Sequence, residues 1–352
     1  MPTDVFDAPA ICKALEEWFA THARDYPWRR TRDPYAILVS EMMLQQTQIP
    51  TVLERGYYQR WMERFPDSAT LARAEEAEVL RAWEGLGYYR RARFLHQAAR
   101  TIEAEHAGAF PTNPTAIRAL PGVGRYTAGA VASFAFDAPE PIVDGNIARV
   151  LSRLCNDETP VDSPAGLDRL WQRASVLVQA AHSPRCLNSA LMELGQTLCR
   201  NGAPECGPCP VRSLCRAQDP AQLPAKSRRT TVTEVTERVF FHQDSTGILL
   251  QQETGRRRTG LWKLPELPTA EPLPPVLQKA KYAITRYRVT LWVHEAPRAT
   301  VIAAMLADPA VRSVPLVEVA LLPMPAPYRK ALNAVLAVNR PEFALSEAIC
   351  DT

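Results

Sequence analysis

The chain has 352 residues, of which 46% are hydrophobic and 22% are charged. This composition is typical of globular proteins, and the length suits about two domains. No apolar run approaches the roughly 18 residues of a membrane-spanning helix, and the first residues lack a secretory signal, so we expect a cytoplasmic protein without membrane association. The net charge of +3 is too small to indicate a partner by itself. Eight cysteines in a reducing compartment favour metal ligation or free thiols over disulfides.

Residues 1–216 have the pattern of a helical domain. Apolar residues recur at spacings of three and four, as in Ile147, Val150, Leu151 and Leu154. Helix starts are also marked, because an aspartate followed by proline supplies an N-cap and a preformed first turn. The sequence therefore predicts a mainly α N-terminal domain.

The pattern changes after this domain. Residues 217–232 are polar, aperiodic and contain prolines, which is typical of a linker. Residues 233–345 then carry β-branched and aromatic runs separated by turn residues, followed by a helical pattern near the end. We expect a smaller α+β domain over this range and a tail over residues 346–352.

Four cysteines form the pattern C-x6-C-x2-C-x5-C within residues 199–215. Short intervening loops allow four thiolates to converge on one soft metal centre. Zinc accepts four cysteines but usually uses two C-x2-C pairs, so an iron–sulfur cluster is the alternative, and a loop with incidental thiols is the third. The proposed ligands are Cys199, Cys206, Cys209 and Cys215.

This spacing at the end of a helical domain resembles the iron–sulfur loop of the endonuclease III superfamily of DNA glycosylases. The resemblance implies a [4Fe-4S] cluster on the four cysteines and double-stranded DNA as the partner. Residues 120–131, LPGVGRYTAGAV, also resemble a helix–hairpin–helix motif. Gly122 and Gly124 would let backbone N–H groups approach a phosphate, although a helix start after a Pro-Gly turn would look similar.

Asp144 stands in the string PIVDGN, directly before a helical pattern. An aspartate there is a good N-cap, and the helix dipole favours its ionised form. An ionised carboxylate suits an oxocarbenium-like transition state. In the resembling superfamily the matching aspartate is catalytic, and Asn146 would support it.

Glu41 lies in SEMMLQQTQ, inside an otherwise apolar helical pattern. A lone glutamate in a helix is usually solvated. This string, however, closely resembles the motif of adenine DNA glycosylases (the MutY family), whose matching glutamate protonates the purine. Burial near Trp28, Met42 and Leu44 would raise its pKa, as a general acid requires.

Tyr126 occupies the hairpin position at which bifunctional members of the superfamily carry a lysine. A phenol can donate a hydrogen bond but cannot form a Schiff base with the sugar. We therefore expect base removal without efficient strand cleavage, with Tyr126 against the sugar or Asp144.

The same resemblance implies further DNA contacts. Gln46 and Tyr88 would insert into the duplex beside the orphaned base. Independently of the resemblance, the low net charge means that local basic patches, such as Arg90, Arg91 and Arg93, would have to contact the phosphates. The alternative for these aromatic and polar residues is an ordinary place in the core or on the surface. The residues implied for the base pocket are Arg24, Trp28, Arg29, Leu44 and Glu193.

Residues 247–267, GILLQQ through TGLWKLPEL, resemble the Nudix-like C-terminal domain with which adenine glycosylases recognise 8-oxoguanine. The carboxylate-rich metal-binding helix of a Nudix hydrolase is missing from the sequence that follows, so a recognition module is the better interpretation. The family's Phe-Ser-His loop is replaced here, and Thr285 and Arg286 are the candidate contacts to the oxidised base.

These observations together predict a monofunctional DNA glycosylase that removes adenine paired with 8-oxoguanine or guanine. We expect a monomer of bacterial type, associated with the nucleoid. The alternatives are a thymine/uracil mismatch glycosylase of the same superfamily and a catalytically idle iron–sulfur DNA-binding module.

Overall fold

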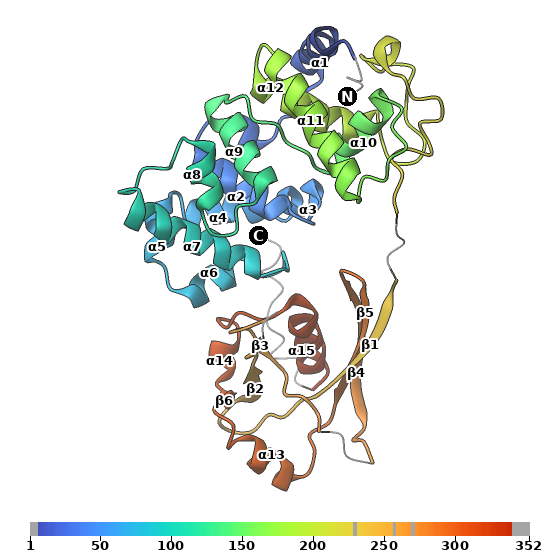
Figure 1. The fold of residues 1–352 in the computed structure, drawn as a ribbon. Helices are drawn as coiled ribbons and strands as arrows, with labels where there is room; N and C mark the ends of the chain where they lie inside the picture. Colours follow the sequence, from blue (N-terminus) through green and yellow to red (C-terminus); the bar gives the residue numbers. More distant parts are fainter. Residues whose placement is uncertain (1–5, 228–230, 256–257, 269–271, 340–352) are drawn as a thin grey trace. The chain divides into compact units, whose positions relative to one another are not determined.

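The computed structural model describes residues 6–227, 231–255, 258–268 and 272–339 (Figure 1). The expected tail at 346–352 lies outside these residues. The chain divides into two compact units. The first unit comprises residues 1–45, 67–69 and 97–229, and the second comprises residues 46–66, 70–96 and 230–352.

The first unit is helical. Several of its helices begin where an Asp, Asn or Ser side chain caps the backbone and a proline occupies the first turn. None of the described helices is both long and apolar enough to cross a membrane. The elements within this unit are α1 (Ala8–His22), η1 (Pro27–Arg29), α2 (Pro34–Leu44), α8 (Pro114–Ala119), α9 (Arg125–Phe136), α10 (Gly145–Leu154), α11 (Pro164–Ala180), α12 (Pro184–Thr197) and η2 (Arg212–Leu214).

One apolar core holds this unit together. Helix α1 packs on α11 and α12, α10 packs on α12, and α2 packs on α9. Fully buried side chains at helical spacing supply the contacts, including Ile11 and Leu15 of α1 and Ile147 and Leu151 of α10. These packed helices fix the backbone around the site described below.

The segment expected to be a linker is hydrogen-bonded to the first unit over much of its length. The buried Arg153 donates from Nε to the carbonyl oxygen of Leu223 at 3.1 Å. The N–H of Ser227 donates to Asp162 Oδ1 at 2.8 Å. The segment is aperiodic but attached to the first unit as far as Ser227, because its backbone groups bond to side chains and to the backbone N–H of Val161.

The second unit contains short helices and two sheets. Helix α5 (Ser68–Arg73) and helix α7 (Arg90–Glu105) cross the boundaries between the units. Trp61 and Trp83 are buried and meet edge to face at 5.2 Å between ring centroids. The remaining helices are α3 (Ile49–Glu54), α4 (Tyr57–Arg64), α6 (Glu76–Ala82), α13 (Ala299–Met305), α14 (Leu316–Val319) and α15 (Ala326–Asn339).

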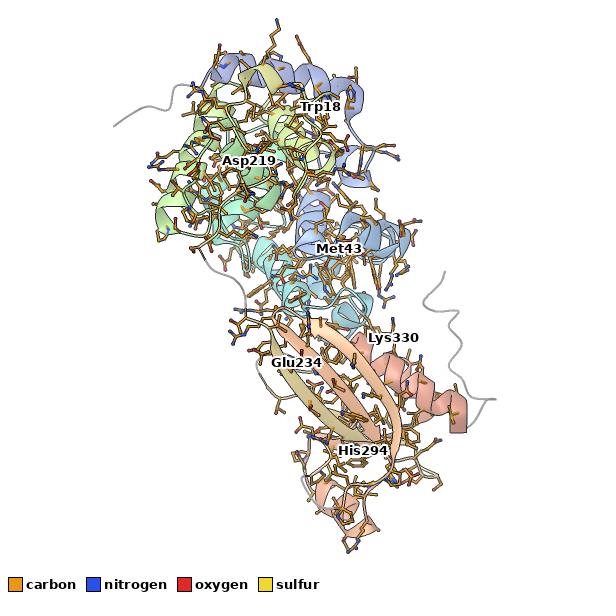
Figure 2. All side chains as sticks on the ribbon, turned by 90° about the vertical axis from the view of Figure 1, so that its right-hand side faces the viewer. Trp18, Met43, Asp219, Glu234, His294 and Lys330 are labelled. Carbon is orange, nitrogen blue, oxygen red and sulfur yellow. The ribbon has the colours of Figure 1, made fainter. Side chains whose placement is uncertain are left out.

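The two sheets have three strands each, in the orders β1-β5-β4 and β3-β2-β6. Strand β1 pairs with β5 in parallel, and the other pairings are antiparallel. Figure 2 shows α15, which carries Lys330, against the curved sheet that carries Glu234 and His294. The strands are β1 (Thr233–Phe240), β2 (Ile248–Gln252), β3 (Trp262–Lys263), β4 (Val276–Ile284), β5 (Tyr287–His294) and β6 (Val311–Val314).

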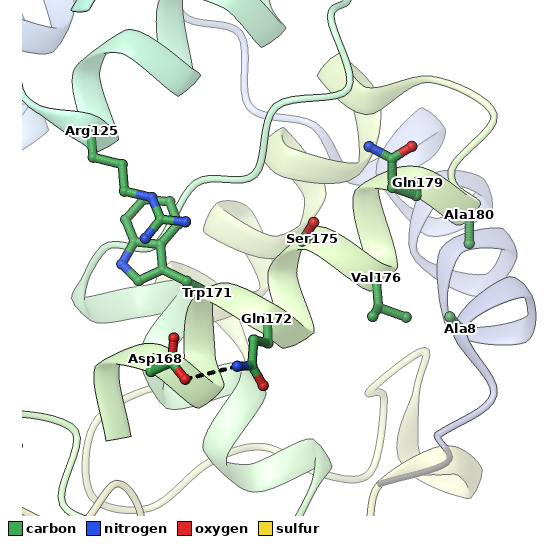
Figure 3. A pocket seen from close by; sticks show the side chains of 9 residues that line it. All are labelled: Ala8, Arg125, Asp168, Trp171, Gln172, Ser175, Val176, Gln179 and Ala180. Atoms are coloured by element: carbon green, nitrogen blue, oxygen red, sulfur yellow. Dashed lines mark hydrogen bonds between the residues drawn. The ribbon is translucent and has the colours of Figure 1, made fainter. Parts of the chain in front are cut away.

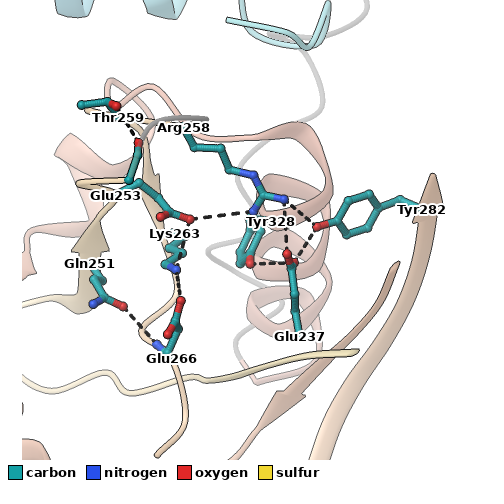
Figure 4. A network of polar contacts seen from close by, with 10 residues as sticks. Glu237, Gln251, Glu253, Arg258, Thr259, Lys263, Glu266, Tyr282 and Tyr328 are labelled. Atoms are coloured by element: carbon teal, nitrogen blue, oxygen red, sulfur yellow. Dashed lines mark hydrogen bonds and ion pairs between the residues drawn. The ribbon is translucent and has the colours of Figure 1, made fainter. Parts of the chain in front are cut away.

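A polar network joins the elements of this α+β region (Figure 4). Glu237 of β1 accepts hydrogen bonds from Tyr282 of β4 at 2.5 Å and from Tyr328 of α15 at 2.9 Å, and pairs with Arg258 at 3.3 Å. Burial raises the pKa of both tyrosine hydroxyls, which keeps them neutral donors. The carboxylate is therefore matched by three donors from different elements.

Contacts within the second unit also connect its helices to the α+β region. Glu84 pairs with Arg329 of α15 at 2.9 Å, and the hydroxyl of Tyr89 donates to the carbonyl oxygen of Met324 at 2.9 Å. These contacts group residues 70–96 with the strands, so the compact units differ from the two expected ranges. The coarser prediction is confirmed, since a mainly helical region is followed by a smaller α+β region.

Candidate active site

Glu41 is buried within α2, and its side chain is only 5% exposed. Its helix neighbours Met42 and Met43 are also buried, so the carboxyl group lies in an apolar environment. This burial raises the pKa of Glu41 to about 7, and the nearby negative charge of Asp144 acts in the same direction. A carboxyl group with this pKa is protonated in a large fraction of molecules at neutral pH.

Asp144 is the N-cap of α10. Its Oδ1 accepts a hydrogen bond from the N–H of Ile147 at 2.7 Å, and its Oδ2 accepts one from Asn146 Nδ2 at 2.9 Å. Both oxygens of the side chain therefore act as acceptors at the positive end of the helix dipole. The expected cap is present, and Asn146 bonds to the carboxyl group it was expected to support.

Tyr126 of α9 lies against Glu41 and within the electrostatic influence of Asp144. Its hydroxyl forms a hydrogen bond with Glu41, which lowers the pKa of Glu41 and offsets part of the effect of burial. Burial and the negative charges of Glu41 and Asp144 raise the pKa of the Tyr126 hydroxyl well above its ordinary value. Tyr126 therefore remains a neutral hydrogen-bond partner of Glu41.

Arg149, which sequence reasoning missed, extends this arrangement along α10. Its Nη2 donates to Asn146 Oδ1 at 2.9 Å and to the carbonyl oxygen of Gly195 at 2.7 Å. Its Nε donates to the carbonyl oxygen of Cys199 at 2.8 Å. The signal in the sequence was its spacing, because residues 146 and 149 lie one turn apart on a helix that starts at the catalytic candidate.

Glu193 of α12 is fully buried and pairs with two arginines from the segment after α1. Its Oε2 lies 2.6 Å from Arg29 Nη1, and its Oε1 lies 3.3 Å from Arg24 Nε. Trp28 is buried beside them, stacked on Tyr26. Four of the five predicted pocket residues thus lie close together; the fifth, the half-buried Leu44, ends α2.

The predicted hairpin forms a tight turn before α9. Gly122 has a positive φ of 75°, and Gly124 is the N-cap of α9, with open space where a Cβ would stand. The next residue, Arg125, lies over the ring of Trp171 at 3.8 Å, at one end of an open groove of about 670 Å³ (Figure 3). The exposed backbone at Gly122 and Gly124 and the guanidinium of Arg125 therefore lie together at the N-terminus of α9.

The four predicted cluster ligands line one cavity of about 280 Å³ with apolar side chains from α10 and α12. In the described part of the chain, no group of three or more Cys, His, Asp or Glu side chains is placed to hold a metal ion. The donor set still fits an iron–sulfur cluster, since four soft sulfur donors border a common space of low polarity. Arg153 donates to Cys199 Sγ at 3.3 Å.

Gln46 and Tyr88 belong to the second unit, and both have left-handed backbones with φ of 58° and 47°. Such values are uncommon for residues other than glycine and are enriched at functional sites. Gln46 is exposed and Tyr88 is half-buried. The neighbouring arginines differ from the expectation: Arg91 is buried and Arg93 pairs with Glu76, so only the exposed Arg90 retains a surface fit for a phosphate.

Thr285 and Arg286 form the two-residue turn between β4 and β5. Both are exposed, and Thr285 has a φ of 52°, which is strained for a β-branched residue. The Arg286 guanidinium lies 5.2 Å from the ring of Tyr287. The turn thus presents a hydroxyl and a cation to solvent.

Comparison with known proteins agrees with this site. Residues 39–173, which include Glu41, Tyr126 and Asp144, match the HhH-GPD superfamily of base excision DNA repair proteins. A solved structure of a thermostable thymine-DNA glycosylase is 29% identical, with a TM-score of 0.53, and the match covers 59% of this chain and 95% of that one.

Relatives within the superfamily are more specific. The chain is 45% identical to the adenine DNA glycosylase of Mus musculus, over 62% of its own length and 44% of the mouse protein. It is 32% identical to that of Buchnera aphidicola subsp. Baizongia pistaciae, over 71% of each protein. The chain belongs to the adenine DNA glycosylase family, which confirms the resemblance seen in its motifs. It spans less than half the length of its mammalian relatives.

Proposed function

We propose that this chain is a monofunctional DNA glycosylase that removes adenine paired with 8-oxoguanine or guanine in double-stranded DNA. The observation that carries the proposal is a pair of neighbouring carboxyl groups in contrasting surroundings. Glu41 is buried and has a pKa of about 7, whereas both oxygens of Asp144 accept hydrogen bonds at a helix N-terminus. Acid-assisted glycosidic cleavage uses two carboxyl groups in such contrasting surroundings.

In the proposed reaction, the protonated Glu41 donates its proton to a ring nitrogen of the flipped adenine. The C1′–N9 bond then breaks, and its electron pair leaves with the neutral base. The carboxylate of Asp144 stabilises or captures the cationic sugar. Water adds at C1′ and loses a proton, which leaves an abasic site. Tyr126 offers no amine that could cleave the strand.

The remaining first-unit residues would hold the substrate. Trp28 and Leu44 supply apolar walls for a purine, and the charged group of Glu193, Arg29 and Arg24 can exchange hydrogen bonds with its edge. The hairpin glycines Gly122 and Gly124 suit a phosphate contact that fixes the position on the duplex. In the second unit, Gln46 and Tyr88 would fill the space left by the flipped base.

The C-terminal region is proposed as a Nudix-like recognition module over residues 233–345, following the helical domain at 1–216 and the linker at 217–232. The sequence after β3 lacks the carboxylate-rich string of a Nudix hydrolase, which favours recognition over metal-dependent hydrolysis. The exposed turn of Thr285 and Arg286 is the proposed contact to 8-oxoguanine, since a hydroxyl and a guanidinium both donate to carbonyl oxygens.

A [4Fe-4S] cluster is proposed on Cys199, Cys206, Cys209 and Cys215, which border one cavity. When bound, it would cross-link the chain after α12 and so stabilise the loop that follows. Because Arg149 bonds both to Cys199 and to Asn146, order in that loop supports the position of Asp144.

The test is single-turnover release of adenine from duplexes that hold adenine opposite 8-oxoguanine, guanine or thymine, with hot alkali revealing abasic sites. Rapid release opposite 8-oxoguanine and slower release opposite guanine are expected. Release of thymine or uracil from pairs with guanine, without adenine release, would identify the mismatch glycosylase instead. Binding without any base release would identify an idle DNA-binding module.

A further inference from the structure

We propose that Arg91 is a positioning residue that holds Gln46 and Tyr88 in the conformations with which they enter the duplex. The inference rests on the proposed function and adds a structural cause for its base-flipping step. It arises from a side chain that was expected to contact phosphate. Arg91 is instead 6% exposed, so its guanidinium is directed into the protein.

Arg91 binds both chain segments that carry the two residues. Its Nη2 lies 3.0 Å from the carbonyl oxygen of Leu86, 3.1 Å from that of Gly87 and 3.3 Å from Thr47 Oγ1. Gly87 directly precedes Tyr88, and Thr47 directly follows Gln46. One guanidinium therefore connects two segments about 40 residues apart in the chain.

The turn before Tyr88 has a second donor that fixes it. Trp83 Nε1 donates to the carbonyl oxygen of Gly87 at 3.0 Å, so this oxygen accepts from both Trp83 and Arg91. The guanidinium of Arg91 also lies 5.3 Å from the ring of Trp83 and 5.5 Å from that of Tyr88. Cation–π contact at such distances favours one orientation of the Tyr88 ring.

The backbone at both segments needs support of this kind. Left-handed conformations at Gln46 and Tyr88 are unfavourable for residues other than glycine and persist only where surrounding contacts determine them. An arginine suits this task because its planar guanidinium can lie against the rings of Trp83 and Tyr88 while Nη2 bonds to the carbonyl oxygens, whereas a lysine ammonium is a point charge with a different geometry. Burial lowers the pKa of Arg91 to about 10, so the side chain stays charged at neutral pH.

The experiment compares full-length Arg91→Lys with Arg100→Lys, a matched change at an exposed arginine on the same helix. A duplex with an uncleavable adenine analogue opposite 8-oxoguanine carries 2-aminopurine next to the pair, as a reporter of unstacking. At saturating protein, Arg91→Lys should reduce the fluorescence rise by more than about half, while Arg100→Lys leaves it unchanged. Thr47→Val, which removes one of the three contacts, should produce a smaller loss in the same direction.

Adenine release gives the second readout. Arg91→Lys should slow release from the paired substrate about 10- to 100-fold, the effect of a misplaced group. Release of adenine from an unpaired bulge does not require insertion of Gln46 and Tyr88, so its rate should change less than about threefold. Equal losses on both substrates, or wild-type fluorescence in both variants, would overturn the proposal.

Two further results keep the outcomes distinct. If the wild-type protein releases no adenine, the proposed function fails, while the fluorescence comparison still tests the role of Arg91. If Arg91→Lys lowers the melting temperature so far that it cannot be studied, Thr47→Val decides, and a wild-type fluorescence rise in that variant then refutes the inference.

Discussion

The end of α2 and the start of α10 each carry one carboxyl group, and the two surroundings are opposite. Glu41 lies in the last turn of α2 among buried apolar side chains, and burial raises its pKa. Asp144 stands at a helix N-terminus and accepts hydrogen bonds from a backbone N–H and from Asn146. The protein thus produces an acid and an anion from chemically similar groups through local structure alone.

The pKa of Glu41 depends on Tyr126 and Asp144 as well as on burial. Tyr126 lowers the pKa of Glu41 by its hydrogen bond, while the charge of Asp144 raises it. The acid and the anion are therefore not independent. Substitutions of Glu41, of Asp144 and of the residues that contact them test whether the first acts as the acid and the second as the anion.

The largest effect is expected from Asp144→Asn. An amide keeps the cap but carries no charge to stabilise a sugar cation, so adenine release should fall about 1,000-fold or more, measured in single turnover. Binding to the mismatched duplex and the free energy of unfolding should change little. Asp33→Asn, the same change at the N-cap of α2, is the control and should retain the wild-type rate. A full rate in Asp144→Asn would refute the assigned role.

The next largest effect is expected from Glu41→Gln, which removes the acidic proton. Release should slow about 100- to 1,000-fold. Because the acid form is the active one and its pKa is about 7, the wild-type rate should fall tenfold per unit as the pH rises above 7. The variant should show no such decline, and Glu17→Gln, at an exposed position, should keep it. A wild-type profile without an alkaline decline would exclude Glu41 as the acid.

A smaller effect is expected from Arg149→Lys. The lysine cannot bond at once to Asn146, Gly195 and Cys199, so the support of Asp144 loosens. We expect a 10- to 100-fold slower release with a little-changed affinity for DNA, measured by single-turnover kinetics and anisotropy. Arg169→Lys, at an exposed arginine of α11, serves as the control. A loss confined to affinity would instead assign Arg149 to DNA binding.

The smallest effect is expected from Tyr126→Phe, which removes the hydrogen bond from Tyr126 to Glu41. Loss of that bond raises the pKa of Glu41 further, so the alkaline decline of the rate should move to higher pH. The rate on its plateau should fall by less than about tenfold. An unchanged pH profile would mean that Tyr126 has no effect on the pKa of Glu41.

Much of this site could be predicted from the sequence because its residues sit in short strings with strong local rules. The cap at Asp144, the turn at Gly122 and the alternation from helical to strand patterns all follow from neighbouring residues. Arg149 was missed because its importance depends on acceptors at Gly195 and Cys199, which folding alone brings to it.

The same reason explains the wrong expectation for Arg91. A run of arginines predicts a charged surface, whereas the burial of one member depends on carbonyl groups presented by a turn and on Thr47, far away in the chain. The division into compact units was also beyond the sequence pattern. It depends on pairs such as Glu84 with Arg329, which are about 245 residues apart.

The N-cap position of Asp144 has a consequence for how this family can change. Active-site residues commonly weaken the fold, so that replacing them stabilises the protein while activity is lost. Here the catalytic candidate supplies a helix cap worth about 1 kcal/mol, and Asp144→Ala would reduce activity and stability together. A substitution that removes the cap at this position would therefore lower activity without raising stability. Selection for stable folding alone would favour an aspartate or an asparagine here.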